Sequence, residues 1–169
     1  TNTTVQLDGI VRTSSIQNIA SPFTLNRLEI LNGPTGGTKA AFVLSGNPLQ
    51  FTADGPTQPR IYSTREATNV ASNNIDIANG TTLYCEMATW GITFNGVISG
   101  GGSIDKLQTA GEITLNNGAN SFSGGLTVRA IDSDWYRVSV NASGAMGTGP
   151  VNIYGGTLST NAANPGGLR

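Results

Sequence analysis

Two aspartates, Asp132 and Asp134, flank Ser133 in the segment IDSDWY, and by residue type they are the pair best suited to acid–base chemistry. Two carboxylates can cleave a glycosidic bond, one acting as the acid and the other as the base or nucleophile. At positions i and i+2 of a strand both would face the same way, with Cα atoms roughly 6–7 Å apart. We favour solvated loop residues over a catalytic pair, because no further acidic or basic groups gather around them.

Histidine is absent from the chain, which removes the commonest general base and metal ligand. A serine or threonine nucleophile would then need Lys39 or Lys106 as its activating base. Cys85 is the single cysteine, so no internal disulfide can form, and its strand-like surroundings favour a buried structural thiol. We therefore expect no enzymatic activity, no catalytic residue and no cofactor. A carbohydrate-active enzyme built on the aspartate pair is the less favoured alternative.

The segment Gly100–Leu107 (GGGSIDKL) comes within one residue of the calcium-binding nonapeptide G-G-x-G-x-D-x-U-x. Ser103 stands where that pattern has its third glycine, and no tandem copy follows. Calcium bound between coils needs ligands from successive repeats. We therefore expect a corner turn here and no metal site.

Aromatic side chains offer another kind of site, because their faces can stack on pyranose rings. Trp135 and Tyr136 lie in the same segment as the aspartates, where a loop could carry a binding function. Trp90 and Tyr154 could join such a platform, although the setting of Trp90 (ATWGI) is equally consistent with core or corner packing. Trp135 and Tyr136 thus support an alternative function, an adhesin-type module that recognises a glycan or a host surface through an exposed loop.

The composition excludes two classes of partner. Charged residues make up 11% of the 169 residues and the net charge is −1, with no cluster of Lys and Arg. Affinity for nucleic acid comes mainly from such basic residues, so we expect no nucleic-acid partner. No apolar run approaches the roughly 18 residues of a membrane helix, so we expect no membrane insertion by this segment.

The elements that must position these residues are short strands. Between Gly96 and Leu158, β-branched runs such as Glu112–Leu115 and Val138–Val140 alternate with Gly, Asn and Ser about every 8 to 13 residues. No run is long enough for a helix, and the regular spacing predicts an all-β solenoid. Residues 64–73 could instead form a helical turn or two, but the alternation that resumes at Asn74–Ile77 disfavours this.

In a β-solenoid every second side chain points into a narrow core, and glycines form many of the corners. The expected core residues are Ile98, Ile104, Ile113, Leu115, Phe122, Val128, Val138, Val140, Val151, Ile153 and Leu158. The expected corner residues are Gly100, Gly111, Gly124, Gly125, Gly147, Gly149, Gly155 and Gly156. The edges of each coil need a neighbouring coil, so we expect end-to-end self-association or continuation of the solenoid in a longer chain.

The same region resembles the autotransporter-associated β-strand repeat of secreted bacterial passenger proteins. The family's successive motifs correspond to Ile98–Lys106, Ala110–Leu115, Asn120–Val128 and Met146–Leu158. Phe122 replaces the usual tyrosine, which keeps an aromatic residue there. Ile131–Tyr136 has the position of an insertion where the family has a short turn.

The resemblance implies a right-handed parallel β-helix, secretion, and no known catalytic residues in the repeat. Together with the composition, it leads us to expect residues 1–169 to be a single solenoid segment of a longer chain, with residues 96–158 as the best-matching repeat. The expected function is that of a non-enzymatic structural segment, a stalk, passenger or fibre-forming part of a bacterial protein. Its expected location is extracellular or on the outer cell surface.

Overall fold

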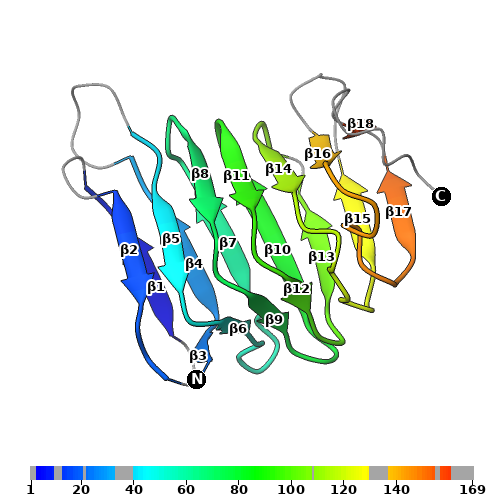
Figure 1. Ribbon diagram of the computed structural model, residues 1–169, viewed down its shortest axis with the longest axis horizontal. Helices are drawn as coiled ribbons and strands as arrows, with labels where there is room; N and C mark the ends of the chain where they lie inside the picture. The colour runs from blue at the N-terminus through cyan, green and yellow to red at the C-terminus, as the bar shows by residue number, and fades with distance from the viewer. Residues whose placement is uncertain are drawn as a thin grey trace.

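A computed structural model describes residues 3–9, 13–20, 22–32, 40–107, 109–129, 137–154 and 157–160, the last range by its backbone alone. In these ranges the chain forms strands and turns and no helix. Its strands pair in parallel as successive coils (Figure 1). The expected all-β solenoid fold is confirmed.

Each coil passes through two long sheets, and four of the coils also pass through a third, shorter sheet. Sheet A contains β1 (Thr4–Leu7), β4 (Arg27–Ile30), β7 (Arg60–Ser63), β10 (Thr82–Met87), β13 (Ser103–Lys106), β15 (Leu126–Arg129) and β17 (Val151–Tyr154). Sheet B contains β2 (Ser14–Gln17), β5 (Val43–Gly46), β8 (Thr68–Ala71), β11 (Gly91–Phe94), β14 (Glu112–Leu115), β16 (Arg137–Val140) and β18 (Thr157–Thr160). Sheet C contains β3 (Phe23–Leu25), β6 (Leu49–Phe51), β9 (Ile75–Ile77) and β12 (Ile98–Ser99).

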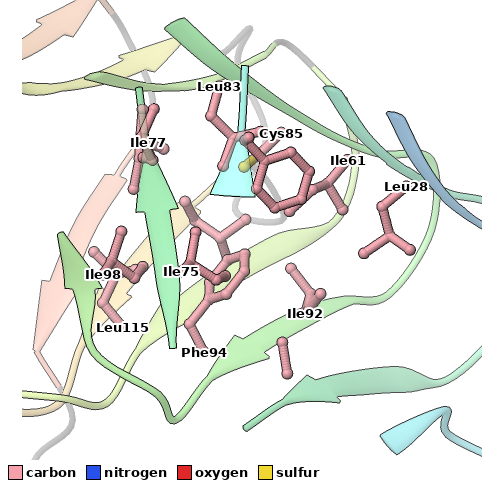
Figure 2. Packing of buried hydrophobic residues seen from close by; sticks show 14 of the residues in the cluster. Leu28, Ile61, Ile75, Ile77, Leu83, Cys85, Ile92, Phe94, Ile98 and Leu115 are labelled. Atoms are coloured by element: carbon pink, nitrogen blue, oxygen red, sulfur yellow. The ribbon is translucent and has the colours of Figure 1, made fainter. Parts of the chain in front are cut away.

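The coils stack in register, so that side chains form columns along the solenoid axis. One inward column of sheet A runs through paired positions from the first to the last strand of that sheet. Its members are Val5, Leu28, Ile61, Cys85, Lys106, Val128 and Ile153. Side chains from all three sheets meet in one interior (Figure 2), and this shared core replaces the separate layers of an ordinary sandwich. Burial of these apolar columns supplies the main stabilising free energy.

Two of the expected core residues are exposed, and for them the prediction is wrong. Val151 and Ile153 are 36% and 49% exposed, although they pair with the buried Leu126 and Val128. Their strand, β17, is the last strand of sheet A, so their inward faces have no following strand in the described part of the chain. The side chain of Leu158 lies outside the described residues. The remaining members of the expected core are buried.

Residues 64–73 form no helical turn: they contain β8, which pairs with β5 and β11. Val70 and Ala71 continue columns of sheet B, and Ala71 is buried next to Leu44 and Phe94. Strand pairing on both edges thus outweighs the weak helical propensity of this segment.

Asparagine side chains reinforce one corner of the stack. Asn116 Nδ2 donates to Asn95 Oδ1 at 2.7 Å, and Asn141 Nδ2 donates to Asn116 Oδ1 at 2.6 Å. Each residue follows the last residue of its sheet B strand, so the amides stack at the coil spacing of about 4.8 Å. The ladder holds three successive coils in one register.

Candidate functional site

The residues expected to contact glycan, Trp135 and Tyr136, lie outside the described residues, as do Asp132 and Asp134 of the candidate acid–base pair. They stand at the place in the chain where β15 of sheet A is followed by β16 of sheet B. We call each connection from a sheet A strand to the next sheet B strand an A–B corner. Trp90 lies at the A–B corner between β10 and β11 and is 62% exposed, so it is not a core residue and its side chain is largely free of packing.

The expected corner glycines serve two physical needs. Gly100, with φ +102°, adopts backbone angles that other residues rarely adopt, and Gly125 and Gly147 share this property. Gly111 instead permits close approach of neighbouring coils, since a Cβ there would lie 2.4 Å from the Met87 Cβ. Gly124 and Gly149 are similarly crowded by backbone atoms, while Gly155 and Gly156 lie outside the described residues.

The calcium-like segment Gly100–Leu107 uses its polar groups for contacts within the protein. Asp105, 6% exposed, accepts hydrogen bonds from Arg129 Nε at 3.0 and 2.9 Å. Among the described residues, no three His, Cys, Asp or Glu side chains gather in a way that could hold a metal ion. The segment forms a corner followed by β13.

Lys106 interrupts the apolar column of sheet A with a fully buried ammonium group. Its Nζ donates to the carbonyl oxygens of Leu107 and Thr109, both at 2.8 Å, and to Thr109 Oγ1 at 3.3 Å. Burial lowers the pKa of Lys106 to about 8. Thr109 Oγ1 also accepts a hydrogen bond from Met87 N at 2.9 Å. The lysine and the threonine thus join the corner to the core, and both are engaged in structural hydrogen bonds.

Cys85 is paired with Lys106 in the next coil and is likewise buried. Burial raises the pKa of this thiol from 9.0 to about 12. The structure agrees with the expected structural thiol, since a reactive cysteine needs a lowered pKa and solvent access.

These two pKa shifts predict a characteristic dependence of stability on pH. Between about pH 8 and 9 the folded chain progressively releases a proton from Lys106 that the unfolded chain keeps, so the unfolding free energy should rise with pH, by roughly 1 kcal/mol or less over this window. Above about pH 9 the unfolded Cys85 loses a proton that the folded thiol keeps, and this opposes the rise. Above the ordinary lysine pKa of 10.5 the unfolding free energy should fall. Urea unfolding from pH 7 to 11 measures this profile.

Two variants separate the contributions of the paired groups. Lys106→Met should remove the rise between pH 8 and 9 and leave only the fall above pH 9. Cys85→Ala should instead extend the rise to about pH 10.5. A Lys106→Met protein that kept the rise between pH 8 and 9 would show that another group causes it.

Arg65 is a fully buried residue that the sequence analysis missed. Its guanidinium donates to the carbonyl oxygens of Gly9 at 2.7 Å, Leu31 at 3.2 Å, Asn32 at 3.3 Å, and Ala40 at 3.0 and 2.8 Å. These carbonyls come from segments far apart in the sequence. Arg65 therefore joins the first coils at their A–B corners.

The two ends of the stack are the remaining candidate sites, and they differ in shape. At the β1 and β2 end, an opening of about 220 Å³ reaches inward to the side chains of Val5, Leu7, Leu28 and Leu44. At the other end, β17 presents the exposed side chains described above. Strands β1 and β2 form the edges at one end and β17 and β18 at the other, in both long sheets. In the described part of the chain, no strand pairs with the outer side of these four strands.

In comparisons with known proteins, no family model, no curated protein and no solved structure matches this chain. Among the described residues, no helix is long and apolar enough to cross a membrane.

Proposed function

We propose that this chain is a non-enzymatic structural segment, a β-solenoid rod whose coils stack end to end. The observation that carries the proposal is the pairing of seven strands in each long sheet, with pairable edges at both ends. The six intervals between seven strands, at about 4.8 Å each, give a rod segment of roughly 29 Å. In solenoids stability accumulates from contacts between neighbours, so further coils lengthen such a rod without changing its section.

The two ends suit each other as a head-to-tail contact. One end offers an apolar opening, and the other offers Val151 and Ile153 in the positions of core residues. A contact between two different surfaces repeats without closing, and such repetition builds filaments. Coils that continue the same chain would satisfy the same edges, and both arrangements produce a rod.

The proposal places this rod outside the cell, as a stalk, passenger or fibre-forming part of a secreted bacterial protein. Its support is the resemblance to the autotransporter-associated repeat over residues 96–158, together with the low charge and the solenoid fold. Labelling of intact and of lysed producing cells with an antibody to this segment tests the location. Signal from intact cells is expected, and signal confined to lysed cells would contradict the placement.

Replacement of Ile153 by lysine is expected to weaken end-to-end association by about tenfold or more, because the inward-facing charge would be buried in the contact. Sedimentation velocity over a concentration series measures the association. Tyr154→Lys is the matched control: Tyr154 is 65% exposed and stands next to Ile153 on the opposite face of β17.

The control variant should associate as the unchanged protein does. A protein that stays monomeric at every concentration would argue against self-association, as would an Ile153→Lys protein that associates normally.

A further inference from the structure

A groove of about 490 Å³ lies on the outer surface of sheet B, beside the A–B corner that carries Trp90. The described residues that line it are Trp90, Thr68, Thr89, Ala110, Glu112, Thr114 and Arg137. Trp90 is 62% exposed, although exposure of a large aromatic surface to water is unfavourable. Both neighbouring coils contribute polar side chains to the same groove.

Small residues around Trp90 create the groove. Gly91 stands between Thr68 and Glu112 in one column of sheet B, so this column lacks a side chain at the coil of Trp90. A Cβ at Gly91 would lie 2.2 Å from the Glu112 carbonyl oxygen, so the close approach of the strands demands glycine. At the corner, the described residues of the following coil that lie beside Trp90 include the small Ala110 and Gly111, and the indole stays exposed.

The turn that carries Trp90 is held from both sides. Thr89 Oγ1 donates to the Arg65 carbonyl oxygen at 2.7 Å in the preceding coil. In the following coil, Glu112 N donates to the Trp90 carbonyl oxygen at 2.8 Å, and Gly111 N donates to the Met87 carbonyl oxygen at 2.7 Å. The exposed indole is therefore presented on a fixed backbone, which reduces the entropy lost when a ligand binds.

The far side of the groove holds an ordered pair of opposite charges. Arg137 Nε donates to Glu112 Oε2 at 2.7 Å, and Thr114 Oγ1 donates to Glu112 Oε1 at 3.2 Å. The Arg137 side chain is 47% exposed and that of Glu112 is 24% exposed, so both reach solvent. Arg137 lies two coils beyond Gly91 in the same column of sheet B, so the Cα atoms of these two residues are roughly 10 Å apart. Hydrogen-bond donors and acceptors thus stand one or two sugar rings away from the indole.

We propose that this groove binds a neutral saccharide of about two pyranose rings. One ring would stack its apolar face on Trp90, and the hydroxyl groups of the next would bond to Glu112, Arg137 and the threonine hydroxyls. Arginine and glutamate are suited to this because they offer planar sets of donors and acceptors to vicinal hydroxyl groups.

Other ligand classes suit the groove less well. Phosphates and nucleic acids need uncompensated positive charge, whereas Arg137 is neutralised by Glu112. An extended peptide would bind by adding a strand, but β8, β11, β14 and β16 are paired on both edges. A single aromatic face among hydroxyl and charged groups fits a ring with one apolar side and a polar rim. This proposal does not depend on the end-to-end association.

Fluorescence titration tests the saccharide site directly. The chain has two tryptophans, so Trp135→Phe leaves Trp90 as the sole reporter. The probes are maltose, cellobiose, lactose and N,N′-diacetylchitobiose, with a heparin disaccharide as the anionic contrast. At least one neutral probe should shift the emission and saturate, and calorimetry with the unaltered chain should give the same Kd.

Variants then locate the binding. Trp90→Ala should raise the Kd measured by calorimetry about tenfold or more, and its melting temperature should be unchanged because the side chain is exposed. Arg137→Gln should weaken binding severalfold. Tyr154→Ala is the matched control, an exposed aromatic residue of sheet A outside the groove, and should bind as before.

Three results would overturn the proposal. The first is that no neutral probe binds saturably, whether or not the heparin disaccharide binds. The second is unchanged affinity in Trp90→Ala. The third is loss of binding in Trp135→Ala with Trp90→Ala unaffected, which would move the site to the segment before Arg137.

Discussion

Replacement of Arg65 by methionine is expected to lower the unfolding free energy of the first coils by about 3–5 kcal/mol. Methionine fills much of the same volume but donates no hydrogen bond, so the carbonyl groups of Gly9, Leu31, Asn32 and Ala40 would lose their donor inside the protein. The guanidinium also lies 4.6 Å from the ring of Phe42, and this contact would be lost too. Urea unfolding of the variant and of the unchanged protein measures the difference.

Hydrogen exchange shows where the loss of stability falls. Because each coil contacts only its neighbours, protection should drop in β1, β2, β4 and β5 and remain in β13 to β16. Arg137→Met is the matched control, since the Arg137 side chain is 47% exposed and makes a surface ion pair with Glu112, whose side chain is 24% exposed. Such pairs contribute up to about 1 kcal/mol. Equal effects of the two substitutions would show that Arg65 does not join the first coils.

Replacement of Gly100 by alanine is expected to lower the unfolding free energy by about 3 kcal/mol or more. The residue has a φ of +102°, and a Cβ there would lie 2.1 Å from the Ile77 carbonyl oxygen. Relief of this clash requires the two coils to separate at their corner, which weakens the pairing of β9 with β12. Chemical unfolding measures the loss.

Gly80→Ala isolates the cost of the backbone angle alone. Gly80 has a φ of +71°, and no atom lies within 4 Å of the position that its Cβ would occupy. This substitution should cost about 1–2 kcal/mol. If Gly100→Ala cost no more than Gly80→Ala, the close approach of coils at this corner would be disproved.

The solenoid fold was predictable because its signal is local and repeated. Alternation within runs such as Glu112–Leu115 and Val138–Val140 assigns each side chain to the inside or the outside, and parallel pairing then builds the columns. The same alternation contained a signal that was missed. Lys106 stands two residues after the buried Ile104 of its strand, so it had to point inward.

Other features depend on neighbouring coils, and no local pattern records them. Arg65 follows a strand at a corner, where a charged residue is normally exposed, and its burial results from carbonyl groups in three distant segments. The exposure of Trp90 depends on the next coil, whose described corner residues beside it include the small Ala110 and Gly111. Val151 and Ile153 have the alternation of core residues, and their exposure follows from the position of β17 at the edge of sheet A.

Negative-stain electron microscopy of the purified protein over a concentration series tests the central claim, that this solenoid is a rod that extends by stacking. We predict unbranched filaments of uniform width that lengthen as the concentration rises, and that are lost with Ile153→Lys and kept with Tyr154→Lys. Dispersed particles of a single size at every concentration would contradict the claim that these coils stack between chains.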